Sequence, residues 1–270
     1  MNGAYNLAYG IDGQFRVTGD DYLTVRLAQT AENDSVNKLL DLSPSRIFIQ
    51  WERRNHKGFS YDFLYSYEGY RYNPGMGFEM IEDFQGFRGI FGYGWFPEEK
   101  ALIRYHRISI TGYNLWNTLT GQQETTYGDI DWHFEAKKGF SGNIFSAWHR
   151  EDLTDTLTLG ADQAYVPPGR YSFTDIAVMY NTSNSNALSA SLLADAGSFY
   201  DGWKVSFSAA PMLNIGSGFD LGLTYALDVV NFPVRNMKFT NHIVGTRGLL
   251  TLTTKTSLSA YVQYNSAVDK

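Results

Sequence analysis

Residues 59–75 read FSYDFLYSYEGYRYNPG, and the first nine of them alternate between large aromatic and mostly polar side chains. The aromatic positions are Phe59, Tyr61, Phe63, Tyr65 and Tyr67. Because a β-strand sends alternate side chains to opposite faces, this stretch predicts a strand with one apolar and one polar face. The fold depends on what the aromatic face contacts, which is either the interior of a protein or the hydrocarbon of a membrane.

Composition narrows the class of protein. The chain of 270 residues has no cysteine, which excludes disulfides, thiolate metal sites and cysteine nucleophiles. A net charge of −6 argues against a nucleic-acid partner. The sequence contains no apolar run of about 18 residues, and residues 1–10 lack the basic and apolar regions of a signal peptide. A mean hydropathy of −0.30 is compatible with a transmembrane barrel, because only alternate residues of such a barrel contact lipid.

The same period of two recurs along most of the chain and predicts fourteen strands. Their expected ranges are 4–17, 22–30, 46–54, 59–72, 84–96, 101–116, 123–136, 141–150, 170–181, 187–196, 202–212, 219–229, 239–252 and 257–265.

Strand length separates the two environments. Several predicted strands run for about 10–15 residues, whereas strands of soluble proteins average about 5–6 and strands that cross a membrane need about 9–11. No helical period is convincing, and the best candidate, SVNKLLDL at 35–42, is short. We therefore expect an all-β, antiparallel transmembrane β-barrel, with the aromatic row of 59–67 facing lipid.

The connections between these strands alternate in expected length. The short ones are 18–21, 55–58, 97–100, 137–140, 182–186, 214–218 and 253–256. The longer ones are 31–45, 73–83, 151–169 and 230–238, with modest ones at 117–122 and 197–201. Outer-membrane barrels have short periplasmic turns and longer external loops, which is the pattern seen here.

The alternation also indicates a direction for the chain. The first strand leads into a short turn and the last one leaves a short turn, so both ends of the chain would lie on the external side. Since the termini of such barrels normally lie in the periplasm, we expect at least one more strand before residue 4 and one after residue 265. Residues 1–270 are then a single barrel domain, an internal fragment of a barrel of about sixteen or more strands.

Charged residues suggest what the polar face does. One strand carries four polar residues in a row on one face: Asp129, Asp131, His133 and Glu135. We expect them to line a wet lumen, balanced by Arg104, His106 or Arg107 on the neighbouring strand. Arg53, Arg54, Arg71 and Arg88 are further candidates for this polar wall, where mixed charges set pore selectivity or pair and close the pore.

An enzyme is the main alternative. His149, predicted near a strand end with Asp152 and Asp155, suits acid and histidine chemistry at the outer rim, and His133 with Asp131 is a second candidate pair. No G-x-S-x-G, HExxH, DxDxDG or phosphate-loop motif occurs, so we expect no metal and no cofactor.

Several phrases resemble a known family. They are FIQWERRNHKGFSYDF at 48–63, YNPGMGFEMIEDF at 72–84, YGWFPEE at 93–99, PPGRYSFTD at 167–175, SFYDGWKVSFS at 198–208 and LSAYVQYNS at 258–266. They are similar to segments of Gram-negative outer-membrane proteins of unknown function, of the type named domain of unknown function 5916. The resemblance implies an upstream domain similar to family-9 carbohydrate-binding modules, a C-terminal β-barrel and no catalytic residues that transfer to this chain.

Together these observations predict a porin-like or transport-associated barrel of the bacterial outer membrane, which also anchors a carbohydrate-binding-like domain. Its partners would be the lipid bilayer and glycans or small solutes. The alternatives are an outer-membrane enzyme with rim or lumen acid and histidine chemistry, and a soluble β-rich carbohydrate-binding protein. In the soluble protein the aromatic rows would be buried between two sheets.

Overall fold

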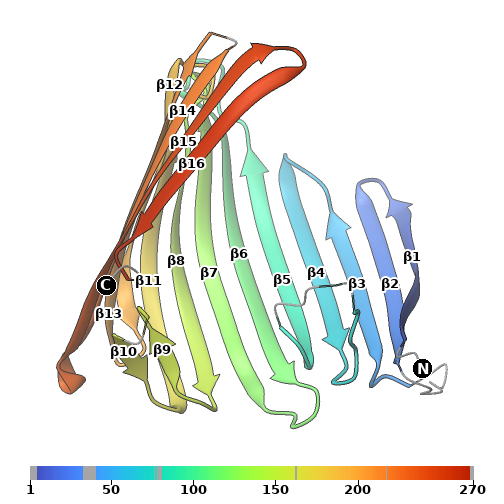
Figure 1. Ribbon diagram of the computed structural model, residues 1–270. Helices are drawn as coiled ribbons and strands as arrows, with labels where there is room; N and C mark the ends of the chain where they lie inside the picture. The colour runs from blue at the N-terminus through green and yellow to red at the C-terminus, as the bar shows by residue number, and fades with distance from the viewer. Residues whose placement is uncertain are drawn as a thin grey trace. The chain divides into compact units, whose positions relative to one another are not determined.

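A computed structural model describes residues 5–32, 41–75, 77, 81–161, 163–216 and 218–267. Fourteen long strands form one antiparallel sheet in which the strands follow one another in chain order (Figure 1). Two short strands, β9 and β10, pair separately as a small hairpin. Within the described residues the single 3₁₀ turn η1, Pro233–Arg235, is the one helical element. None of the described helical segments is long and apolar enough to span a membrane.

All fourteen strands predicted from the sequence are present, so the all-β class and the strand number are confirmed. Their bounds are β1 Asn6–Thr18, β2 Asp21–Glu32, β3 Ser45–Arg53, β4 Gly58–Glu68, β5 Phe84–Trp95, β6 Ile103–Asn117, β7 Gln123–Ala136, β8 Ser141–Leu153, β11 Gly169–Asn181, β12 Leu188–Phe199, β13 Gly202–Ile215, β14 Phe219–Phe232, β15 Met237–Thr253 and β16 Thr256–Asn265. The helical candidate at 35–42 lies mostly outside the described residues.

Two predicted connections are wrong, because the strands on either side of them are longer than predicted. The expected long connection at 230–238 shrinks to Pro233–Asn236, because β14 continues to Phe232 and β15 begins at Met237. The expected connection at 197–201 shrinks to a two-residue turn, with Phe199 opposite Gly202 across it. Val230 and Phe232 extend the apolar character of β14 past its predicted end at residue 229.

The sequence also missed a hairpin in the connection between β8 and β11. Strand β9, Leu157–Leu159, pairs antiparallel with β10, Ala164–Val166. Three residues are too few to establish a period of two, so this segment was predicted only as a long loop.

The chain divides into two compact units. The first contains residues up to Gly94 together with 109–128, and the second contains 95–108 and 129–270. Strands β1–β5 belong to the first unit and β8–β16 to the second, apart from Trp95 at the end of β5.

The sheet has two open edges. In the described residues β1 has β2 as its one hydrogen-bonded neighbour, and β16 has β15. An antiparallel sheet of this length is the component from which a barrel is made, but its closure, and its insertion in a membrane, remain predictions.

Candidate functional site

Strand β4 separates aromatic from polar side chains as its sequence predicts. Phe59 and Phe63 are 55% and 47% exposed. Tyr61, which lies between them, and Tyr65, which follows Phe63 in the row, are half-buried. These rings contact aromatic rings of the neighbouring strands: Phe59 lies 4.9 Å from Tyr93 and Tyr65 lies 4.9 Å from Phe87, centroid to centroid. Tyr67 follows at the end of the row and is also half-buried. The row therefore continues sideways as an aromatic surface.

The apolar face is exposed on every long strand of the described chain. Large apolar side chains at alternate positions remain open along the sheet, among them Leu7, Ile11, Phe15, Leu27, Ile49, Phe87, Ile108, Ile110, Ile130, Ile144, Ile176, Val178, Leu192, Val205, Phe207, Leu223, Val244, Leu258 and Val262. No second sheet or helix of the described residues covers them. A monomeric soluble protein rarely exposes a contiguous apolar patch of more than a few hundred Å².

All six tryptophans lie at alternate positions on this same apolar face. Trp51 contacts Tyr61, Trp116 contacts Phe87, and Trp95 and Trp132 stack on either side of His106. Trp148 and Trp203 each precede a residue of the polar face, His149 and Lys204, in a regular strand.

Polar groups reappear on the apolar face at the ends of β2. At the start of the strand Asp21 accepts hydrogen bonds from Nε and Nη2 of Arg53, at 2.6 and 2.8 Å, and the Arg53 guanidinium lies over the Tyr61 ring. Near the other end, Gln29 accepts a hydrogen bond of 2.8 Å from the Tyr9 hydroxyl. Only apolar residues, Leu23, Val25 and Leu27, occupy this face between the two sites.

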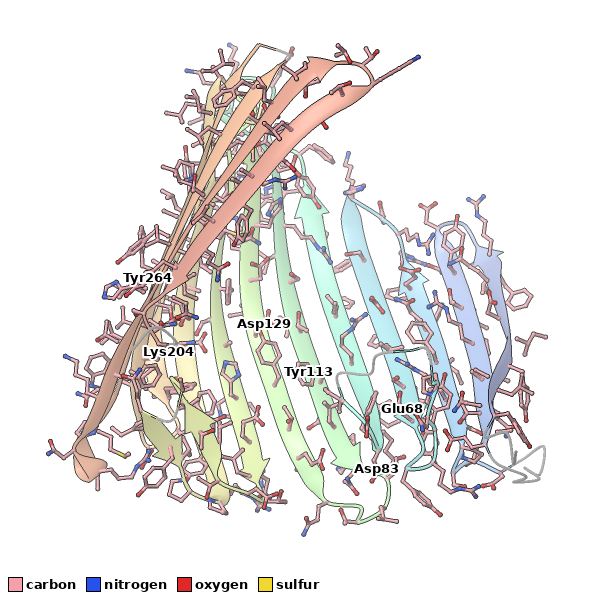
Figure 2. The ribbon with its side chains drawn as sticks, in the orientation of Figure 1. Glu68, Asp83, Tyr113, Asp129, Lys204 and Tyr264 are labelled. Atoms are coloured by element: carbon pink, nitrogen blue, oxygen red, sulfur yellow. The ribbon has the colours of Figure 1, made fainter. Side chains whose placement is uncertain are left out.

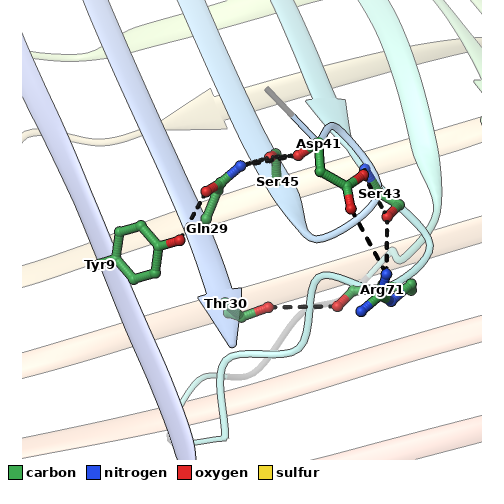
Figure 3. A network of polar contacts seen from close by, with 7 residues as sticks. All are labelled: Tyr9, Gln29, Thr30, Asp41, Ser43, Ser45 and Arg71. Carbon is green, nitrogen blue, oxygen red and sulfur yellow. Dashed lines mark hydrogen bonds and ion pairs between the residues drawn. The ribbon is translucent and has the colours of Figure 1, made fainter. Parts of the chain in front are cut away.

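Figure 3 shows how the second of these polar sites continues into the connecting segments. The Gln29 amide donates to the Asp41 carbonyl and to the Ser45 hydroxyl, each at 2.9 Å. The Asp41 carboxylate lies 3.8 Å from Nη1 of Arg71 and accepts a hydrogen bond from the Ser43 hydroxyl. The network therefore ties residues 41–45 and Arg71 to the end of β2.

The distance between the two polar sites measures the height of the apolar band. Eight residue steps separate Asp21 from Gln29, which at about 3.3 Å per residue is roughly 26 Å along the strand. A tilt of about 40° reduces this to roughly 20 Å, close to the apolar band of about 25 Å in outer-membrane barrels.

The opposite face of the first unit carries paired charges. Arg88 donates to Asp62 at 2.8 Å, Arg54 contacts Glu52 at 2.5 Å, and Arg46 lies 3.4 Å from the buried carboxylate of Glu68, which is labelled in Figure 2. Arg53 does not belong to this set, although the sequence analysis placed it there. It alternates with Arg54 and therefore lies on the aromatic face.

Three of the four polar residues predicted on β7, Asp131, His133 and Glu135, share a network in the second unit. The Asn143 amide donates to Asp131 at 2.8 Å, and the Asn143 side-chain oxygen lies 3.1 Å from Nδ1 of His133. Glu135 lies 3.5 Å from Nε2 of His133 and accepts a hydrogen bond of 2.5 Å from Arg104. Asp129, labelled in Figure 2, precedes this network on the same strand.

His106 was expected to balance these carboxylates, and that expectation is wrong. Its Nδ1 accepts a hydrogen bond of 3.2 Å from the indole N–H of Trp132, and its ring stacks on Trp95. The position alternates with the buried Tyr105, so His106 shares the aromatic face.

His149 lies inside β8, four residues from its end, rather than in a rim cluster with Asp152 and Asp155. Its Nε2 is 2.7 Å from the carboxylate of Asp175 on β11, and its ring stacks on Phe173. Asp152 instead pairs with Arg170 at 2.7 Å. Beside His149 is a cavity of about 190 Å³, also lined by Asp195 and Lys204, whose charged atoms are 3.7 Å apart.

This cavity is lined by a histidine, two carboxylates and a serine. The serine hydroxyl is not hydrogen-bonded to the histidine, so these residues do not form an activated serine nucleophile. The Ser198 hydroxyl donates to the Thr174 carbonyl at 3.1 Å and accepts from the Thr174 N–H at 2.8 Å. Its hydrogen bonds therefore go to the backbone of β11. Across the described part of the chain no group of three or more metal-ligating side chains is found.

Asp175, Asp195 and Lys204 were not among the residues predicted for this polar face, whereas the alternation of residues 59–67 already placed Asp62 opposite the aromatic row. The period of two placed each on the correct side of its strand, but pairing across strands depends on the register, as in Asp195 opposite Ser206. The partners stand on diagonal positions, two residues away from the facing one, as Arg88 faces Leu64 and not Asp62.

Comparison with protein-family models, with characterised proteins and with solved structures finds no match to this chain.

Proposed function

We propose that this sheet is part of the wall of a transmembrane β-barrel in a bacterial outer membrane, and that its polar face lines an aqueous lumen. The barrel would be porin-like or transport-associated. It would also anchor the carbohydrate-binding-like domain that the sequence resemblance implies. The observation that carries the proposal is the continuous exposed apolar face, which is bounded by polar side chains at both ends of β2.

Energetics favour lipid over water on that face. Each aromatic side chain presents about 150–250 Å² of surface. Leaving one large apolar side chain in water, where it could be fully buried, costs about 1.5–3 kcal/mol. Summed over the exposed rows, this cost would exceed the stability of an ordinary domain, about 5–15 kcal/mol. Hydrocarbon removes the cost for every strand at once.

A soluble β-sandwich fits less well. In a sandwich the apolar faces of two sheets pack about 10 Å apart and bury each other. The described residues contain one long sheet, and the only covering element, the β9–β10 hairpin, packs on side chains of the polar face.

The polar face supports passage of small hydrophilic solutes. Charges on it are paired across strands, as in Asp62 with Arg88 and Asp195 with Lys204, so they are held in place without a ligand. Fixed rings or rows of charge along a lumen are a source of ion selectivity.

The test is single-channel recording. The complete protein that contains this chain is purified from outer membranes in detergent and inserted into planar lipid bilayers. Discrete conductance steps are expected, together with recovery of the protein in the outer-membrane fraction. A protein found in that fraction that is ion-tight refutes the transport role, and recovery in the soluble fraction refutes the barrel itself.

A further inference from the structure

The hairpin β9–β10 covers part of the sheet within the second unit. Alternation along β10 turns Ala164 and Val166 inward, at 1% and 0% exposure, and leaves Tyr165 between them 45% exposed. The two inward residues form a buried cluster with Val230, Phe232 and Phe239. Leu157 and Leu159 of β9 pack against the same cluster.

The hairpin lies on the polar face. On β14 the cluster residues Val230 and Phe232 alternate in step with Asp228, which accepts a hydrogen bond of 2.6 Å from the Ser206 hydroxyl. Ser206 in turn is in step with Lys204, the partner of Asp195. Phe239 on β15 stands directly opposite Val230. The cluster is therefore an apolar island among the charged residues of this face.

The island exists only because the hairpin covers it. Phe232, with no exposed surface, and Phe239 would otherwise face water on the side of the sheet that carries the paired charges. The fit is close. A Cβ added at Gly160, which joins the two short strands at a φ of +61°, would lie 2.9 Å from Cδ2 of Phe239. Burial of this apolar surface holds the hairpin down.

A guanidinium that is held by an ion pair lies against the outer side of the hairpin. Arg235 of η1 donates to the Asp201 carboxylate from Nε at 2.9 Å and from Nη2 at 2.5 Å. The same guanidinium lies 4.1 Å from the ring centroid of Phe232 and 5.4 Å from that of Tyr165. Its side chain is only 15% exposed. The connections after β12 and β14 thus hold the Arg235 guanidinium against Tyr165, the middle residue of β10.

We infer that the β9–β10 hairpin is a seated constriction of the lumen, which limits the size of the solutes that pass and presents Tyr165 to them. The inference rests on the proposed barrel, whose lumen is on the side of the hairpin. The hairpin, the apolar cluster beneath it, Arg235 and Asp201 all belong to the second unit. Their contacts therefore do not depend on how the two units are placed. Because the hairpin is fixed to the sheet, the constriction is permanent: small ions pass it and bulky solutes do not.

This chain has no cysteine, so an introduced one is the only thiol that its 270 residues offer to a label. Tyr165→Cys and Val166→Cys are prepared in the complete protein and exposed to a bulky maleimide in detergent. Tyr165→Cys is expected to react rapidly and Val166→Cys at least about tenfold more slowly, because only the latter is buried. Equal rates would overturn the inference. In bilayers, labelled Tyr165→Cys is expected to pass less current than its unlabelled form, and an unchanged current would also overturn it.

A deletion separates this inference from the proposed function. Residues 157–166 are replaced by a short Gly-Ser linker, with the exposed turn 254–255 lengthened by the same linker as the matched control. Single-channel conductance is expected to rise about twofold or more in the deletion and to stay unchanged in the control. Unchanged conductance in a deletion variant that still inserts refutes the constriction and leaves the barrel intact. Loss of both variants and of the parent from the outer-membrane fraction would instead refute the barrel.

Discussion

Neighbouring residues of this chain occupy opposite environments. Arg53 lies over an aromatic ring at the edge of the apolar face, and the next residue, Arg54, pairs with Glu52 on the polar face. Trp148 and His149 differ in the same way. Residue type alone does not separate the two arginines, whereas position in the alternation does, and a one-residue error in register would exchange them.

Tyr200 is the residue whose titration is most altered outside the strands. Burial, reinforced by the charge of Glu151, raises the pKa of Tyr200 to about 12 from 10.0. Between these values the unfolded chain has released the proton and the folded chain has not. Stability is therefore fully present below pH 10 and falls as the pH rises toward 12. Tyr200→Phe is expected to reduce this alkaline loss in denaturant unfolding, whereas the exposed Tyr70→Phe leaves it unchanged. Identical alkaline profiles for the parent and Tyr200→Phe would contradict the assignment.

The carboxylates of β7 give a prediction for ion selectivity. Replacing both Asp129 and Asp131 by lysine reverses two charges and makes the polar face four units more positive. If that face lines the lumen, the cation-to-anion permeability ratio is expected to fall roughly twofold or more, measured as a reversal potential across a salt gradient. Glu98→Lys, on the exposed connection between β5 and β6, is the matched control. A shift of equal size in the control would show that the β7 carboxylates do not face the permeating ions.

At the scale of elements, the strands were predictable and the covering hairpin was not. Long rows such as 59–67 and 219–229 carry a period of two for enough residues to identify a strand. Strands β9 and β10 have three residues each, and their two inward side chains become recognisable only when Phe232 and Phe239 are seen beneath them. The charge pairs between strands were equally hidden, because they depend on register and not on local sequence.

The two faces of β4 should tolerate charge differently. Phe63, at the middle of the strand on the apolar face, is replaced by lysine, and Ser66→Lys, on the polar face near Glu68, is the control. Lysine at the lipid midplane is expected to cost about 2–4 kcal/mol of folding free energy, against about 1 kcal/mol or less for the control. Urea-induced unfolding from lipid vesicles measures both. Equal costs at the two positions would show that the aromatic face is not in hydrocarbon.

At the scale of the whole molecule, sequence and structure agree on an all-β antiparallel sheet of fourteen strands. Closure of the sheet into a barrel stays a prediction. The unpaired backbone groups at the edges of β1 and β16 can bond to any strand, so the sequence does not specify which strand pairs with them. The apolar face, in contrast, is a property of the whole sheet. It is present on the long strands of each unit.

Depth-dependent quenching of tryptophan fluorescence tests the central claim most directly, because all six tryptophans lie on the apolar face. The complete protein is reconstituted in vesicles whose lipids are brominated at different depths along the acyl chain. If other domains of that protein contain tryptophan, this chain alone is used. Strong quenching by brominated lipids is expected, strongest for bromine near the headgroups, with little quenching by aqueous iodide. Emission that iodide quenches and brominated lipid leaves unchanged would contradict the account.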